Sequence, residues 1–479
     1  MTTSGLLAAL ILGSFFHFDM GPAMTRPTTQ VPPAWTAAVS GDLVTPQTAW
    51  WTLFREPVLD RCVEEAFRNN RDLEQALARV EQARAVLGET RGQQSPELNL
   101  KVNTARARVI EGANGSSSPT NTNDVLGAVS YEADLWSKLR KATTAAKRQL
   151  LASEAARDTV RLSLAGQVTK TYFTLRGQDQ QLQIARQTLS TREEALGLRK
   201  LRYDKGLTSE LDYRQDQAET AVAAVQVRQL ENAVARSEHA LLVLLGRNPQ
   251  ELVANQVTRG VSLDALPQPP EIPPGLPSQL LERRPDIRQA EQSYLAALAK
   301  IGEAKAAQFP VLSLTGLFGS ASTELEDLFT GPTAWELAGQ ILAPLVDGGK
   351  RKSRVSKAEA AARESLGSYD TTVQGAFRET LDALVGNTKT QEILVLQTEQ
   401  EKAQSRAYDL AKAKYEGGSV SHLDLLDAER QLFQVQLDLE GARTNRLNAV
   451  ADLCLALGGG WDAASGDRTP KAQATGTKR

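Results

Sequence analysis

The sequence has little of what metal, redox and nucleic-acid sites are built from. It contains two cysteines, Cys62 and Cys454, and three histidines, with no CxxC pair and no cysteine–histidine cluster. A metal or redox centre therefore lacks a ligand set with the usual spacing, and we expect both cysteines to be small buried side chains. The formal net charge of -2 gives no excess of Lys and Arg for nucleic-acid binding. We expect neither a cofactor nor a nucleic-acid partner.

Long hydrophobic runs are also missing. The apolar stretch from Leu6 to Phe16 is too short to span a bilayer and is typical of a signal-peptide core, so residues 1–20 are predicted to be a signal segment. No later stretch offers about 20 uninterrupted apolar residues, so no transmembrane helix is expected. An exported chain of this kind can be periplasmic, secreted or a β-barrel. Residues 21–61 are expected to form an extended tail, and residues 461–479 a flexible one.

Proline is absent from two very long stretches, Thr120 to Asn248 and Leu345 to Thr469. Proline is the main helix breaker, so these stretches permit very long helices. Apolar residues recur there every seven positions, which is typical of coiled-coil packing. In the first stretch the recurring residues are Val168, Leu175, Leu182, Leu189, Leu196 and Tyr203.

The chain repeats itself. At a fixed offset of 212 positions Tyr203 corresponds to Tyr415, Gly206 to Gly418 and Asp212 to Asp424. We predict two copies of one plan, residues 62–250 and 276–460, joined by a proline-rich extended linker at 251–275. Each copy is predicted to contain a helix, a β-hairpin and a long helical hairpin. The helical hairpins are expected to turn at Gly206 and at Gly417–Gly418.

Each copy also carries two stretches in which apolar and polar residues alternate. They lie within 97–136 in the first copy and within 311–346 in the second, and they are about as long as a tilted membrane strand. A half-buried soluble hairpin shows the same alternation, so this pattern alone leaves both readings open. Four strands are too few to close a barrel, and open sheet edges are not tolerated in lipid. A barrel would therefore require several chains.

Several distinctive motifs follow one another along the chain, including GPAMTRP, AWWTLFREPVLDRC, YEADLWSKLR, ERRPDIRQAE, FPVLSLTG, APLVDGGKRKS and KYEGGSVSHLDLLDAERQL. In this order they resemble the TolC-type outer-membrane efflux family, in its NodT/OprM-like branch, over about residues 21–460. The resemblance implies a mainly α fold with a transmembrane β-barrel. A homotrimer would form a 12-stranded β-barrel that continues into a 12-helix periplasmic α-barrel.

The same resemblance implies a passive exit duct in the outer membrane of a Gram-negative cell, not an enzyme. Its implied partners are a periplasmic adaptor (membrane fusion) protein, an inner-membrane RND-type pump and outer-membrane lipid. The runner-up hypothesis is a periplasmic coiled-coil tether or a membrane-shaping structural protein. Such a protein needs the heptads but not strand-like stretches at matched places in both copies. His422 beside Asp424 suggests a metal site only weakly, and we expect a solvated histidine at the tip.

The resemblance also implies a gate at the periplasmic tip. The family's ring aspartates correspond to Asp424 and Asp427, and its latch partners to Asp212 and Tyr415. A ring of carboxylates would repel itself and attract cations, which suits a cation-selective constriction. The alternative for Asp212 and Asp424 is helix capping, since both follow a turn. The family's latch arginine is replaced by Val420, so the latch is expected to differ.

Two further expectations follow from the resemblance. The two turns correspond to the tips that dock the adaptor, with a plain turn as the alternative; they comprise Gly206, Leu207, Thr208, Ser209, Gly418, Ser419, Val420 and Ser421. Many members of this branch carry a lipid on an N-terminal cysteine, but Ser14 stands at the expected position. We therefore expect no thioether lipidation there.

Overall fold

The computed structural model describes residues 18–33, 35, 49–108, 119–254, 257–267, 269, 272, 277–331 and 333–459. Most of the predicted signal segment, with Ser14, and the whole of the predicted C-terminal tail lie outside the described residues. The contacts divide the chain into two compact units. One comprises residues 1–29, 78–155 and 288–371, and the other residues 30–77, 156–287 and 372–479. Each unit draws on both copies of the repeat.

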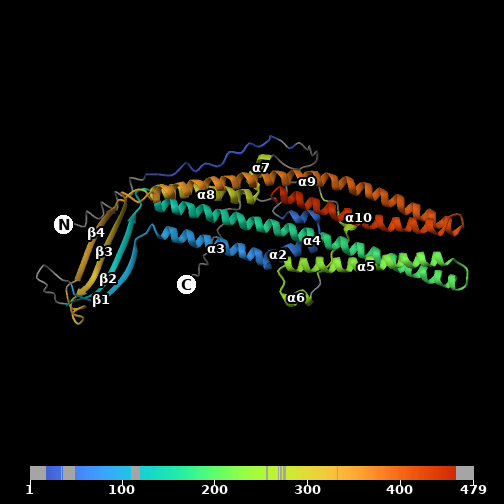
Figure 1. The fold of residues 1–479 in the computed structure, drawn as a ribbon, viewed down its shortest axis with the longest axis horizontal. Helices are drawn as coiled ribbons and strands as arrows, with labels where there is room; N and C mark the ends of the chain where they lie inside the picture. The colour runs from blue at the N-terminus through green and yellow to red at the C-terminus, as the bar shows by residue number, and fades with distance from the viewer. Residues whose placement is uncertain are drawn as a thin grey trace, which may run out of the picture. The chain divides into compact units, whose positions relative to one another are not determined.

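The first unit contains a four-stranded antiparallel sheet in the order β1-β2-β3-β4 (Figure 1). The strands are β1 (Glu97–Arg108), β2 (Pro119–Ala133), β3 (Val311–Ser322) and β4 (Thr333–Leu342). They lie where the alternating stretches predicted strands. The two hairpins are joined side by side, because β2 of the first copy pairs with β3 of the second from Asn123 opposite Ser322 to Ala133 opposite Leu312. Within the described residues, β1 and β4 each keep one unpaired edge.

The helices show the duplication in their lengths. Both long helices, α4 and α9, have 67 residues, and both returning helices, α5 and α10, have 35. The helices of the described residues are η1 (Trp50–Phe54), α2 (Pro57–Asn69), α3 (Arg71–Gly92), α4 (Lys138–Asp204), α5 (Glu210–Leu244), α6 (Pro249–Ala254), η2 (Leu263–Ala265), α7 (Pro277–Arg283), α8 (Pro285–Ala306), α9 (Lys350–Glu416) and α10 (His422–Ala456). No helix among the described residues is both long and apolar enough to cross a bilayer.

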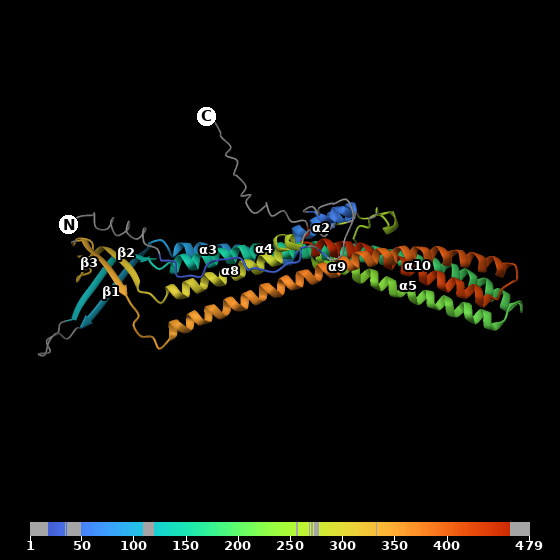
Figure 2. The ribbon, with the colours of Figure 1, turned by 90° about the horizontal axis from the view of Figure 1, so that it is seen from above.

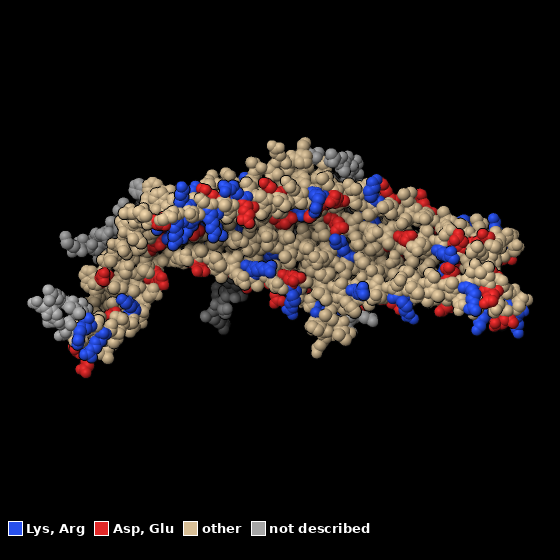
Figure 3. Space-filling model, viewed as in Figure 1, with Lys and Arg blue, Asp and Glu red and all other residues tan. Residues whose placement is uncertain are grey.

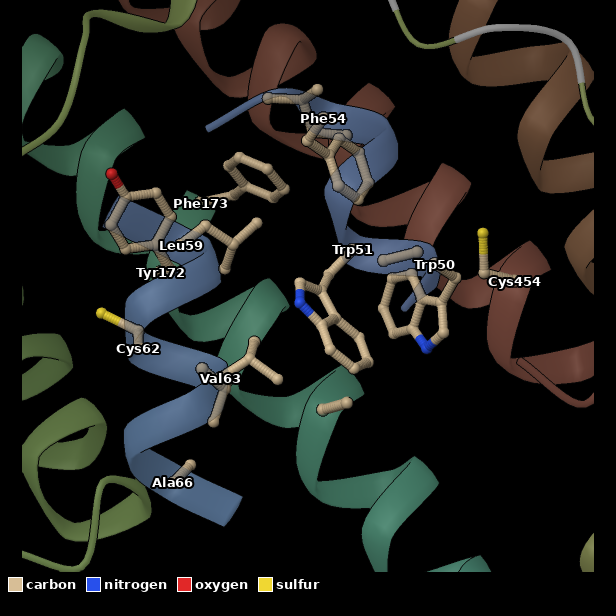
Figure 4. Packing of buried hydrophobic residues seen from close by; sticks show 14 of the residues in the cluster. Trp50, Trp51, Phe54, Leu59, Cys62, Val63, Ala66, Tyr172, Phe173 and Cys454 are labelled. Atoms are coloured by element: carbon tan, nitrogen blue, oxygen red, sulfur yellow. The ribbon is translucent and has the colours of Figure 1, made fainter. Parts of the chain in front are cut away.

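An aromatic core lies in the second unit, where η1 and α2 pack on the long helices. Figure 4 shows Trp50, Trp51 and Phe54 gathered with Leu59 of α2 and Phe173 of α4. The rings of Phe54 and Phe173 are 4.7 Å apart between centroids, which is close enough for a favourable edge contact. Both cysteines are free and buried, as the composition predicted.

The two copies close in the same way at the junction between their short and long helices. Asn70 donates from Nδ2 to the Leu244 carbonyl over 3.0 Å, and Arg284 donates from Nη1 to the Ala456 carbonyl over 3.1 Å. These bonds satisfy carbonyls that the ends of α5 and α10 would otherwise leave unpaired. Both helices then end at a left-handed glycine, Gly246 or Gly458.

The helical hairpin α4–α5 lies beside the hairpin α9–α10 in both ribbon views (Figures 1 and 2). An apolar cluster joins them and comprises Leu182, Ala185, Val227, Leu230, Phe433 and Leu437. The heptad seam of α4 is buried at Val168 and Leu175, but Tyr203 at its far end is 37% exposed. The apolar seam is therefore less buried near the turns, and polar side chains make the contacts between the helices there.

Candidate functional site at the helical tip

Both turns end their long helix in the same way. Gly206 and Gly418 have φ values of 74° and 73°, in the left-handed region that favours glycine. Leu207 donates its N–H to the Arg202 carbonyl, and Ser419 donates to the Lys414 carbonyl, each over 2.8 Å. This is the Schellman pattern at a helix C-terminus. In the second turn Gly418, and not Gly417, takes the left-handed conformation.

Serine begins the next helix in both copies. Ser209 accepts a hydrogen bond from the Asp212 N–H, and Ser421 accepts one from the Asp424 N–H. Asp424 returns the contact, because its Oδ2 accepts from the Ser421 N–H over 3.0 Å and from the Ser421 hydroxyl over 2.7 Å. These hydrogen bonds lower the pKa of Asp424. The capping alternative therefore describes what Asp424 does within the chain.

The other predicted gate residues take different partners. Asp427 is exposed and accepts from Nε2 of Gln431 over 2.7 Å. Asp212 accepts from the Thr208 hydroxyl over 3.1 Å. Tyr415 accepts at its hydroxyl from Nη1 of Arg199 over 3.2 Å. No hydrogen bond joins Tyr415 to Asp212 in the described part of the chain, so these two latch positions do not pair with each other.

A polar cluster that the sequence did not reveal lies close to the turns, on the four helices that the turns join. We call it the tip clamp, and it consists of Arg199 on α4, Asp216 on α5, Tyr415 on α9 and His422 on α10. Nε of Arg199 donates to Oδ2 of Asp216 over 2.8 Å. His422 places Nε2 at 2.6 Å from Oδ1 of Asp216 and Nδ1 at 2.9 Å from Nη2 of Arg199. All four helices of the two hairpins therefore meet in one network.

The expectation of a solvated histidine was wrong. The side chain of His422 is 10% exposed and that of Asp216 is 7% exposed. A neutral imidazole with its proton on Nε2 satisfies both contacts, since Nε2–H donates to Asp216 and Nδ1 accepts from Arg199. No group of three or more His, Cys, Asp or Glu side chains that could hold a metal ion occurs among the described residues. The histidine instead ties the two hairpins together.

Charge within the tip clamp is balanced. Burial raises the pKa of Asp216, but hydrogen bonds from His422 and Arg199 outweigh it, and the pKa lies below its usual range. Burial lowers the pKa of Arg199, and its hydrogen bonds to Asp216 and Tyr415 raise it above the usual value. Both groups are therefore held in their charged forms at neutral pH. A buried charge needs such partners, because removing one leaves the other uncompensated.

A second polar layer lies beside the tip clamp, further from the turns. Arg192 of α4, only 5% exposed, donates from Nε to Glu429 of α10 over 2.9 Å and from Nη1 to the Glu219 carbonyl of α5 over 2.9 Å. Its guanidinium also lies over the ring of Phe433, 5.6 Å from the centroid. Arg430 of α10 extends the layer by donating to Glu219 over 2.7 Å. Two layers of charge thus cross-link the hairpins at the tip.

A signal for these residues was present in the heptads. Arg192 and Arg199 follow Ala185, a buried seam position of α4, at intervals of seven residues. Asp216 precedes Ala223, a seam position of α5, by the same interval. Charged residues in register with a buried seam indicate a buried polar network. The apolar heptad members alone do not reveal this network, because its residues are charged.

Comparisons with known proteins agree on one family. The sequence profile described as "Outer membrane efflux protein" matches residues 62–247 and 276–459. The outer membrane protein OprJ of Pseudomonas aeruginosa is 34% identical over 476 residues, covering 96% of each chain. A solved membrane protein from the same species is 34% identical with a TM-score of 0.85, covering 92% of this chain and all of the other.

A further comparison concerns a channel solved in an open state. The MtrE outer membrane channel of Neisseria gonorrhoeae is 29% identical with a TM-score of 0.82, covering 92% of this chain and 98% of the other. The two profile matches cover most of the chain and fall on its two copies. The predicted family, outer-membrane location and efflux function are confirmed. The chain belongs to the outer membrane efflux protein family of Gram-negative bacteria.

Proposed function

We propose that three copies of this chain close a 12-stranded β-barrel and a 12-helix α-barrel, which together form the exit duct of a tripartite efflux system. The unpaired edges of β1 and β4 carry this proposal. Each edge strand exposes large apolar side chains, including Leu98 and Leu100 on β1 and Trp335 and Ile341 on β4. An open edge is not stable in lipid, and pairing β1 of one copy with β4 of the next removes every edge.

The tip is proposed to be the gate of this duct. Asp424 and Asp427 lie one turn apart near the start of α10 and are exposed to solvent. Three copies of each would form rings of negative charge that favour cations over anions. The tip clamp would hold α9–α10 against α4–α5, so opening requires either that the clamp breaks or that both hairpins move together.

The partners of the duct are proposed to be a periplasmic adaptor protein and an inner-membrane RND-type pump. The two turns are the candidate docking points. They are short and solvent-exposed, and Leu207 at the first one is 76% exposed. Contact with the adaptor would act on the helices next to the tip clamp, which gives a direct route from docking to opening.

Channel activity is the property that separates this proposal from the coiled-coil tether. The protein is to be extracted from the membrane fraction in detergent and added to planar lipid bilayers. The duct predicts discrete single-channel currents that prefer cations. A water-soluble dimer without conductance would support the tether and contradict the duct.

Docking can be tested by cysteine cross-linking. Ser209→Cys or Ser421→Cys, co-expressed with the adaptor, should give a cross-linked product. Cys62 and Cys454 are buried and free, so they leave the introduced thiol as the reactive one. Glu231→Cys, halfway along α5, provides the control and should give no product. Equal cross-linking from Glu231 and from the turns would refute the tip assignment.

A further inference from the structure

The start of α9 carries an unusual concentration of positive charge. Residues 350–357, which we call the α9 basic segment, contain five cations and no carboxylate: Lys350, Arg351, Lys352, Arg354 and Lys357. All of them except Arg351 are exposed. Figure 3 shows a group of Lys and Arg side chains over this part of the molecule, where α9 leaves the sheet.

Helix stability does not explain this charge. The N-terminal end of a helix carries partial positive charge, so cations in its first turns are unfavourable and carboxylates are favoured. The first turn of α9 has no acidic residue. An energetic cost at this place indicates that the cations serve contacts outside the helix.

The corresponding position of the other copy shows what internal pairing looks like. The cations at the start of α4 each contact a carboxylate: Lys138 contacts Glu132, Arg140 contacts Asp134 and Lys141 contacts Asp19. Lys350 occupies the position of Lys138 in the repeat. Among the described residues, Lys350, Lys352, Arg354 and Lys357 form no salt bridge, while Arg351 is bound to Asp347 over 3.2 Å. The second copy thus offers exposed cations with no carboxylate of the described residues at ion-pair distance, where the first copy pairs its cations.

The chain immediately before the α9 basic segment is apolar and exposed. Ile341 and Leu342 end β4, and Leu345 and Val346 follow at 91% and 93% exposure. Such a run beside a cluster of cations is what a chain shows where it passes from the hydrocarbon region to the lipid headgroups. The step from apolar to cationic takes only a few residues.

Aromatic side chains lie at the same junction of sheet and helices. The ring of Trp136, which follows β2, stacks on Phe18 and on Phe309, with centroids 5.4 and 4.7 Å apart. Tryptophan and other aromatic residues gather at the boundary between membrane and water. Two independent features therefore place that boundary at the start of the long helices.

We propose that Lys350, Lys352, Arg354 and Lys357 bind the phosphate groups of anionic phospholipids in the leaflet that faces the helical part of the protein. The proposal rests on the proposed barrel, because the barrel sets the sheet in the membrane. Clusters of four or more cations beside a membrane segment attract anionic lipid, each contributing roughly a fivefold gain in binding. The segment would fix the depth of the barrel in the bilayer.

Native mass spectrometry of the detergent-solubilised protein, titrated with phosphatidylglycerol or phosphatidylcholine, tests the proposal. The wild-type protein should retain phosphatidylglycerol in preference to phosphatidylcholine. Replacing all four cations by glutamine (K350Q, K352Q, R354Q and K357Q) should reduce that preference by about tenfold or more. The matched control replaces four exposed cations further along the same helix: K402Q, R406Q, K412Q and K414Q.

The other outcomes are equally informative. An unchanged lipid preference in the first variant, or an equal loss in the control, overturns the proposal. Break-up of the oligomer in the first variant overturns it too, because the cations would then pair with a neighbouring copy of the chain. Displacement of phosphatidylglycerol by inorganic phosphate at equal concentration would identify a phosphate site and not a lipid one. Bilayer conductance of both variants shows separately whether the duct itself is intact.

Discussion

His422 of α10 and Asp216 of α5 are linked by a contact of 2.6 Å between Nε2 and Oδ1, and both side chains are nine-tenths buried. The two residues belong to different copies of the repeat and to different helical hairpins. Because Arg199 bonds to the same carboxylate, the contact is part of a network that fixes one hairpin against the other. The tip of this protein is therefore held within a single chain.

Removing the central charge of the tip clamp should open the tip. Asp216→Asn keeps the shape of the side chain but leaves Arg199 without its buried carboxylate. A hydrogen bond to a charged group contributes about 1.5–3 kcal/mol, so the open state should gain on the order of tenfold or more in population. Planar-bilayer recordings should show larger or longer openings than those of the wild-type protein.

The control for this experiment is Glu231→Gln. Glu231 pairs with Arg186 of α4 and Arg228 of α5, so its ion pairs lie within one hairpin. Currents should stay at the wild-type level in this variant. Equal effects of the two substitutions would mean that the link between the hairpins has no special role.

Acid should weaken the tip clamp in a defined range. The pKa of Asp216 is lower in the folded chain than the ordinary value of about 3.9. The stabilisation that the ionised Asp216 gives the tip clamp is therefore fully present above about pH 4. It is lost as the pH falls through the lowered pKa. The difference in open probability between wild type and Asp216→Asn should shrink as the pH falls below about 4 and through the lowered pKa of Asp216. A difference that persists to the lowest accessible pH would argue against this carboxylate.

The gate role of Asp424 and Asp427 can be separated from capping. Asn at position 424 can still accept a hydrogen bond from the Ser421 N–H, so it preserves the cap that Asp424 provides. The double substitution Asp424→Asn and Asp427→Asn should therefore leave the helix start intact while raising conductance and weakening cation preference. Reversal potentials in a salt gradient measure the preference. Unchanged selectivity would limit Asp424 to its capping role.

The helical elements could be predicted because their signals are local. The lack of proline and the heptads predicted a long helix between the β-hairpin within 97–136 and the turn at Gly206, and α4 spans Lys138–Asp204. The turns were predicted from glycines, because few other residues adopt the left-handed backbone conformation. Such features depend on residues that are close together in the sequence, so they can be recognised without knowledge of the fold.

The tip clamp depends on which helix faces meet, and a single sequence does not reveal that. Tyr415 was predicted as a latch position without its partner, and the residue that faces it is Arg199, more than two hundred positions earlier in the chain. His422 was interpreted as solvated because it directly follows the predicted turn at the tip. Its burial comes from α4 and α5 of the other copy, which pack against it only in the folded protein.

Alanine substitution at two glycines with the same φ should lower the stability of the protein by different amounts. Gly206 and Gly246 both have a φ of 74°. A Cβ at Gly206 would meet no atom within 4 Å, whereas a Cβ at Gly246 would lie 2.2 Å from the Asn69 carbonyl oxygen. Gly206→Ala should cost about 1–2 kcal/mol for the left-handed backbone alone, and Gly246→Ala should cost clearly more. The midpoints of thermal unfolding in detergent compare the two variants, and equal shifts would refute the steric argument.

This chain is proposed to close a channel only as three copies. Native mass spectrometry of the particle that conducts in bilayers measures the number of chains directly. The predicted mass is three times that of the single chain, which is 51.9 kDa for 479 residues. A conducting particle of one, two or four chains would contradict the proposed arrangement of strands and helices.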